Sequence, residues 1–149
     1  MRLHHIILFS LALTLLGCTP DKPKTNTTSL NLKQLMEWVI DSNADVIWDS
    51  VKFITTNEGT KEIFPQTDQE WEAIRNSSAT LIEAGNLLML EGRAKDNAEW
   101  IRYAQRLSNT AEVALKAAQE KNKEALFDAG GNIYNACKAC HDKYAQLDK

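Results

Sequence analysis

The residues with the most distinctive chemistry in this 149-residue chain lie near its C-terminus, in the string Cys137-Lys138-Ala139-Cys140-His141. C-x-x-C-H is the attachment motif of a c-type haem. Two thiols three residues apart on a helix can each form a thioether bond to one vinyl group of the macrocycle. His141 follows about one turn after Cys137, so it can reach the iron as the proximal ligand. The motif therefore predicts one covalent haem c held by Cys137, Cys140 and His141.

The N-terminal segment resembles a targeting peptide. It begins with the basic Arg2 and continues with an apolar run over residues 6–16, too short to span a bilayer but long enough for a signal-peptide core. The run ends in Leu15-Leu16-Gly17-Cys18, which resembles the lipobox of bacterial lipoproteins. That resemblance implies cleavage after residue 17 and a lipid on Cys18. An ordinary signal peptide with an incidental cysteine is the alternative.

The small number of histidines and cysteines limits the kinds of metal site that this chain can form. Without residues 1–17, which contain His4 and His5, His141 is the only histidine, and Cys137 and Cys140 are the only cysteines besides Cys18. A Cys₂His₂ zinc site needs a second histidine, and a Cys₄ site needs two more thiols. Ligation of haem by two histidines is excluded for the same reason. One haem with a single histidine ligand fits this inventory.

The charge balance and the other polar residues exclude several classes of function. Removal of Arg2 leaves sixteen basic and twenty acidic residues, a net charge of −4. This mild acidity, without a basic stripe that alternates with aromatic residues, argues against nucleic acid as a partner. No nucleophile–base pair or carboxylate dyad is apparent, so we expect no enzyme.

The elements that must position the motif are predicted to be helices. Residues 18–29 lack large apolar residues and are expected to form a flexible tether. Helical apolar spacing starts at Leu30, behind Ser29 as a cap, and runs to Ile54. The polar residues 41–43 suggest a break and a restart capped by Ser42, and the stretch is either one kinked helix or two helices. A loop over 55–67 follows. Further helices are expected from Thr67 to about Leu90, after Asp96, and from Asn122 to the C-terminus.

We therefore predict an all-α protein, an antiparallel four-helix bundle over residues 30–149, with no strand of useful length. Small residues on the predicted inner faces favour close packing there. Ser78 and Gly85 would let another helix or a flat macrocycle approach, and an alanine stripe on the third helix favours close helix packing. Gly130 and Gly131 each cost about 1 kcal/mol within a helix, which suggests close approach of another helix or of the haem edge.

The pattern resembles the cytochrome c′ family and its cytochrome c556 relatives. The resemblance rests on Ala129-Gly130-Gly131, on residues 137–142 and on Tyr144, all in the last predicted helix. It implies haem c attached to the C-terminal helix and electron transfer as the function. It also implies that the sixth position of the iron faces the first helix. A methionine there gives six-coordinate iron, whereas an apolar residue leaves the iron five-coordinate.

Met36, on the apolar side of the first predicted helix, is the candidate for the sixth ligand, and a core methionine is the alternative. If the polar residues 41–43 shift the register of this helix, Val46 or Ile47 would face the iron instead, with Trp48 nearby. Met89 is expected to belong to the core. Lys138 and Lys143 are either partners for the haem propionates or an acidic protein, or plain solvated residues.

Three functions remain open at this point. The first is electron transfer with a redox partner in the periplasm or membrane. The second is binding of nitric oxide or another diatomic gas by five-coordinate haem. The third is a haem-free lipoprotein in which C-x-x-C is a redox dithiol or part of an intermolecular metal site, although such dithiols usually accompany a βαβ pattern. The lipid on Cys18 implies membrane attachment facing the periplasm. Thr19 in place of aspartate favours the outer membrane, and a homodimer is compatible with the family resemblance.

Overall fold

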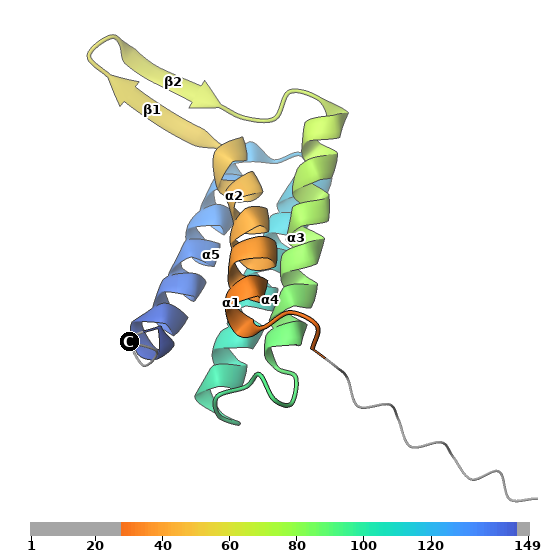
Figure 1. Cartoon of the computed structure of the whole chain (residues 1–149). Coiled ribbons are helices and arrows are strands. Elements are labelled where there is room, and N and C mark those ends of the chain that lie inside the picture. The colour runs from red at the N-terminus through yellow and green to blue at the C-terminus, as the bar shows by residue number, and fades with distance from the viewer. Residues whose placement is uncertain (1–27, 146–149) are drawn as a thin grey trace, which may run out of the picture.

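The chain is mostly helical over residues 28–145, which are the residues that the structure describes. This computed structural model contains α1 (Leu32–Leu35), the π-helix η1 (Met36–Ile40), α2 (Asp41–Ser50), β1 (Lys52–Thr56), β2 (Gly59–Ile63), α3 (Asp68–Leu88), α4 (Glu99–Gln119) and α5 (Lys123–Tyr144). Because α1, η1 and α2 follow one another without a gap, residues 32–50 are called the first helix below. Figure 1 shows the first helix, α3, α4 and α5 lying side by side.

The predicted signal peptide (1–17), Cys18 and most of the predicted tether lie outside the described residues. Within residues 28–145, no helix combines the length and apolar character needed to cross a bilayer.

The first helix starts at Leu32 rather than near Leu30, because Asn31 and not Ser29 is its cap. The Asn31 side chain accepts a hydrogen bond from the Gln34 amide at 2.9 Å, and the Gln34 side chain accepts one from the Asn31 amide at 3.0 Å. This reciprocal pair is a capping box, which satisfies two of the free amides at a helix start.

Of the two possibilities that residues 41–43 left open, the structure has one helix rather than two, because the helix continues through these residues and is widened just before them by η1. The predicted restart at Ser42 is therefore wrong. Ser42 does not cap a new helix: its hydroxyl donates to the Trp38 carbonyl oxygen at 2.8 Å. The side-chain amide of Asn43 (Nδ2) donates to the Val39 carbonyl oxygen at 2.7 Å. The polar side chains thus bond to carbonyls of the wider turn, so the chain does not need to leave the helix.

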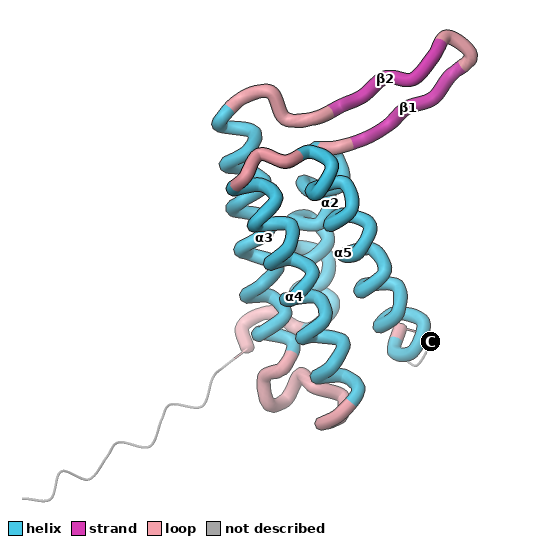
Figure 2. Tube along the Cα trace, turned by 180° about the vertical axis from the view of Figure 1, so that it is seen from behind, coloured by secondary structure: helices cyan, strands magenta, loops and turns pink. Residues whose placement is uncertain are grey.

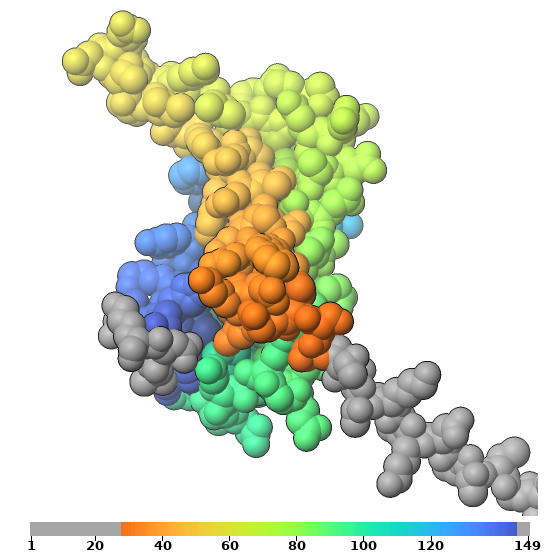
Figure 3. Space-filling view, in the orientation of Figure 1, coloured from red at the N-terminus to blue at the C-terminus, as the bar shows by residue number. Residues whose placement is uncertain are grey.

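A β-hairpin replaces the end of the first predicted helix and most of the predicted loop. The first helix ends at Ser50, Val51 is extended, and β1 pairs antiparallel with β2, with Ile54 opposite Lys61. The β-branched and aromatic residues of β1 favour an extended strand, and Gly59 supplies a positive φ of 129° after the tight turn. The prediction of no useful strand was therefore wrong. Figures 2 and 3 show that the hairpin projects from one end of the helices.

The predicted starts of the later helices are largely confirmed. Thr67 and Glu70 form the expected capping box of α3, and Asn122 caps α5 by accepting from the Ala125 amide at 2.9 Å. α4 begins at Glu99, slightly later than the Asp96 pattern predicts. One carboxylate oxygen of Asp96 still accepts hydrogen bonds from two amides at the start of that helix.

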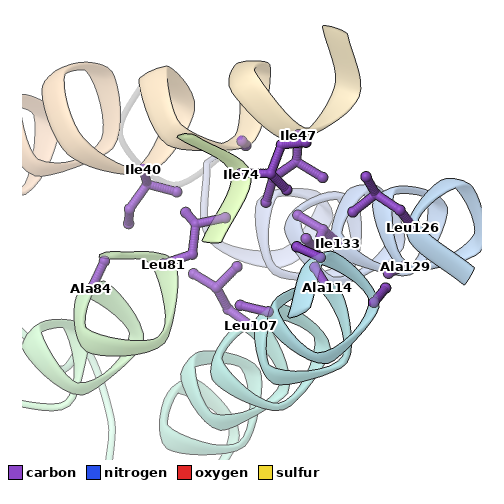
Figure 4. Close-up of a cluster of buried hydrophobic side chains, with 14 of the residues drawn as sticks. Ile40, Ile47, Ile74, Leu81, Ala84, Leu107, Ala114, Leu126, Ala129 and Ile133 are labelled. Atoms are coloured by element: carbon purple, nitrogen blue, oxygen red, sulfur yellow. The ribbon is translucent and has the colours of Figure 1, made fainter. Parts of the chain in front are cut away.

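The core lies between the four helices, and side chains from all of them point toward one another in Figure 4. The fully buried large side chains are Leu35, Ile47, Ile74, Leu81, Leu126 and Ile133. α3 packs closely along α4. The absence of a side chain at Gly85 allows this, since a Cβ there would clash with the Ser108 hydroxyl oxygen. The predicted close approach at Gly85 is thus made by a helix. The first helix packs mainly on α3 and touches α5 more sparsely.

Candidate haem site

The three residues of the C-x-x-C-H motif lie in the last turns of α5, close to one another on one side of the helix. Cys137 and Cys140 are half-buried free thiols that pack against the core, and His141 is exposed to solvent. Residues at positions i, i+3 and i+4 share a helix face. α5 therefore presents two thiols and an imidazole together toward the space that separates it from the first helix and α4.

All three motif residues and Met36 line one cavity. Its inner part has a volume of about 30 Å³ and lies among apolar side chains of four helices, namely Ile40, Leu88, Trp100, Tyr103, Ala104, Leu107 and Ala136. An outer groove of about 490 Å³ shares Met36, Asp41, Trp100, Cys140 and His141 with the inner part. The groove has the size of a typical small-molecule site.

The π-helix η1 determines which side chains of the first helix line this cavity. The Asp41 amide donates a hydrogen bond to the Met36 carbonyl oxygen, which brings residues five apart onto neighbouring turns. Both side chains consequently line the inner cavity and the outer groove. The alternative residues lie elsewhere: Val46 is exposed, while Ile47 and Trp48 line a separate groove beside Gly130.

Burial sets the electrostatics of the two thiols. Desolvation, reinforced by the negative charge of Asp41, raises the pKa of Cys137 to about 11, and desolvation also raises the pKa of Cys140. The pKa of Asp41 is itself raised by burial, although the nearby His141 opposes this shift. Thiols with raised pKa values stay protonated near neutral pH and are weak nucleophiles. A low-pKa redox dithiol would need the opposite environment.

No family model, no curated protein and no solved structure matches this chain.

The residues present fit a haem c. Two thiols and an imidazole come from α5, a thioether comes from the first helix, and the cavity walls between them are apolar. Within residues 28–145, no three His, Cys, Asp or Glu side chains gather as the ligands of a separate metal ion. Two thiols, an imidazole and a thioether form a donor set whose chemistry suits a covalent haem c.

The last turn of α5 is tied to the start of α4 by contacts that the sequence did not reveal. The Tyr144 hydroxyl donates to the Asp96 carboxylate that also accepts from the Trp100 amide, and the Tyr144 ring meets the Trp100 ring edge-on at 5.0 Å. Lys143 forms an ion pair with Glu99 beside them. In the sequence, Asp96 could be recognised only as a helix cap. These contacts hold the turn that carries His141.

Neither Lys138 nor Lys143, for which an approach to the haem propionates and plain solvation were both open, lines the cavity. Lys138 forms an ion pair with Asp142 at 2.6 Å, and Lys143 with Glu99. The lysines that line the outer groove are Lys33 and Lys95, which no motif in the sequence marks. They come from the start of the first helix and from the segment before α4, and only the folded chain brings them to the groove.

Two other sequence predictions have a clear structural outcome. Gly130 is approached closely, since a Cβ there would lie 3.3 Å from the Trp48 ring, whereas nothing lies within 4 Å of a Cβ on Gly131. Met89 packs partly buried against the core, away from the cavity lined by the motif. The expected lipidation site, Cys18, lies outside the described residues.

Proposed function

We propose that this protein is a monohaem c-type cytochrome that transfers electrons, with haem c bound through Cys137 and Cys140 and His141 as the proximal ligand. The observation that carries the proposal is the cavity in which both thiols, the imidazole and Met36 meet. Bound there, haem c supplies one-electron chemistry at its iron. We further propose that the four helices form an antiparallel bundle of the cytochrome c′ type, with the haem on α5.

The residues around the cavity support this proposal by their expected roles. The apolar side chains, Leu88, Trp100 and Leu107 among them, exclude water from the macrocycle. The contacts of Tyr144 and Lys143 with the start of α4 fix the turn that presents His141. Met36 faces the cavity from the first helix, which favours it as the sixth ligand. With that position filled by the chain, electron transfer is favoured over gas binding.

The proposal includes the location and partners of the protein. The lipobox-like segment supports removal of residues 1–17, lipidation of Cys18 and attachment to the periplasmic side of a bacterial membrane, with the outer membrane favoured by Thr19. The expected partner is a periplasmic or membrane-bound redox protein. No catalytic residues and no nucleic-acid contacts are proposed.

The attachment of haem is tested by producing the full chain together with a cytochrome c maturation system. We expect a pyridine haemochrome spectrum typical of thioether-bound haem, and haem that stays with the protein in a denaturing gel. Cys137→Ala and Cys140→Ala should each remove one thioether bond and alter this spectrum. Cys18→Ala is the matched control, because it removes the predicted lipid site and leaves the motif intact. Absence of covalent haem from the unaltered chain would overturn the proposal.

The role of Met36 is tested separately with Met36→Leu, which nearly conserves volume. The unaltered protein should resist carbon monoxide and nitric oxide and show six-coordinate iron. Met36→Leu should bind both gases and show five-coordinate iron. Equally rapid gas binding by both proteins would instead support the gas-binding function and assign Met36 to the core.

A further inference from the structure

A second groove, with a volume of about 420 Å³, lies between α2 and α5, which are neighbours in Figure 1. We call it the α2–α5 groove. It shares no lining residue with the candidate haem cavity or with the outer groove of that cavity. Its floor is apolar, because it contains the buried core residues Ile47, Val51 and Leu126. The α2–α5 groove therefore has the size and the apolar floor of a separate small-molecule site.

Three aromatic side chains line the α2–α5 groove, and two of them meet at a steep angle. The ring planes of Trp48 and Tyr134 form an angle of 69°, with the ring centroids 6.3 Å apart. The indole N–H of Trp48 donates to the Gly130 carbonyl oxygen at 2.9 Å, which fixes this ring. The third ring, that of Phe127, packs edge-on against Phe53 of β1 with the centroids 5.0 Å apart. The groove thus has aromatic walls in several orientations that are in place without a ligand.

The charge of the α2–α5 groove has a single sign. Asp128 is the only charged residue that lines it, and its exposed carboxylate forms no ion pair within residues 28–145. The faces of aromatic rings carry negative electrostatic potential and attract cations. The carboxylate and the rings are therefore complementary to a positively charged ligand and unfavourable to an anion.

Gly131 keeps the groove open along α5. Its neighbour Gly130 is explained within the chain, because a Cβ there would lie 3.3 Å from the Trp48 ring. A Cβ on Gly131 would meet nothing within 4 Å, although glycine costs about 1 kcal/mol in the middle of a helix. Because Gly131 lines the groove, a larger side chain at this position would occupy it. A ligand in the groove would explain the glycine.

We infer that the α2–α5 groove binds an organic cation with a methylated ammonium group, of which choline is the simplest probe. The methyl groups of such a cation contact the ring faces of Trp48, Tyr134 and Phe127. The Asp128 carboxylate balances its charge. Aromatic rings gathered around a quaternary ammonium group are a general means of recognising it. None of these residues is a proposed haem ligand, so the inference stands independently of the proposed function.

The first test is calorimetric titration of the full chain with choline and with 3,3-dimethylbutan-1-ol, its neutral isostere with carbon in place of nitrogen. Choline should bind in the millimolar range or more tightly. The neutral alcohol should bind about tenfold more weakly or worse, because it lacks the charge that the carboxylate and the rings attract. Absence of choline binding in the millimolar range overturns the inference, and so does equal affinity for the two compounds.

Three variants test the position of the cation. Asp128→Asn and Tyr134→Leu should each weaken choline binding about threefold or more, because each removes one attraction to the positive charge. Gly131→Leu should abolish binding and leave the helical circular dichroism spectrum intact, since a side chain there has free space within the chain. Glu112→Gln removes an exposed carboxylate of α4 and should change nothing. Choline binding that tolerates all three groove variants overturns the inference.

A competition experiment separates a soluble ligand from a lipid head group. It uses the chain with Cys18→Ala, so that no lipid anchor contributes, and vesicles of phosphatidylcholine or of phosphatidylglycerol. Competition with choline by phosphatidylcholine vesicles alone assigns the groove to the lipid head group. Absence of competition by either kind of vesicle assigns it to a soluble ammonium compound. Equal competition by both kinds shows that the groove does not recognise the ammonium group, which overturns the inference.

Discussion

The close contact between α3 and α4 at Gly85 gives a quantitative prediction for Gly85→Ala. A Cβ at this position would lie 2.1 Å from the Ser108 hydroxyl oxygen and 2.9 Å from the Ala104 carbonyl oxygen. The Ser108 hydroxyl can rotate away, but it would then lose its hydrogen bond to the Ile82 carbonyl oxygen, 2.9 Å away. The Ala104 carbonyl belongs to the α4 backbone and yields only if the two helices separate.

Three contributions decide the magnitude. Alanine is favoured over glycine in a helix by about 1 kcal/mol. Loss of the Ser108 hydrogen bond costs about 1 kcal/mol. Overpacking of two close helices costs about 1–3 kcal/mol. We therefore expect Gly85→Ala to lower the free energy of unfolding by about 1–3 kcal/mol. Helix propensity alone would predict the opposite, a higher free energy of unfolding.

The assay is urea unfolding followed by circular dichroism, with wild type, Gly85→Ala, Ser108→Ala and the double variant compared as a cycle. The midpoint should fall in Gly85→Ala with little change in the slope. Ser108→Ala removes the oxygen that clashes, so the double variant should lose less stability than the sum of the single variants, by at least about 0.5 kcal/mol. Equal or higher stability of Gly85→Ala than wild type would refute the close contact.

Three further predictions concern single contacts. Burial and the hydrogen bond to Asp96 raise the pKa of Tyr144 to about 12, so the wild-type protein should lose stability between pH 10 and pH 12, where the unfolded chain ionises first. Tyr144→Phe should not show this loss. Denaturation midpoints over this pH range test the prediction, and an unchanged alkaline slope would contradict it. Thr67→Ala removes the capping box of α3 and should cost about 1 kcal/mol in urea unfolding, whereas no cost would mean that the cap is not formed in solution. Trp48→Phe removes the hydrogen bond to Gly130 and should also cost about 1 kcal/mol, and amide exchange in α5 should quicken locally near Gly130 if this bond holds the two helices together.

The sequence predicts the helices well where local chemistry decides them. Thr67 and Asn122 are recognisable because a cap depends on residues only three positions apart. The same reasoning fails at residues 41–43, where polar side chains suit a break and a bond to a preceding carbonyl equally well. The choice between them depends on burying both Leu35 and Ile40, which is a property of the folded core.

The sequence does not predict the hairpin, because the spacing of Val51 and Ile54 also suits a helix. The contact between Phe53 and Phe127, far apart in the sequence, helps to hold β1 where it lies. At the candidate site, the motif itself could be recognised from five consecutive residues. The groove lysines and the bond between Tyr144 and Asp96 could not, because they join segments that meet only after folding.

The π-turn at the start of the first helix changes how the residues of this helix are to be counted. Leu35 and Ile40 are both almost fully buried, yet residues five apart in an α-helix point about 140° away from each other. The turn therefore accommodates one residue more than a regular helix with the same buried side. Deletion of the exposed Trp38 would bring Leu35 and Ile40 to the spacing of an ordinary α-helix. When this helix is aligned with a regular one, a one-residue gap is consequently needed after Met36, within residues 37–40. Without that gap, Met36 and the residues before it are matched to the wrong helix face.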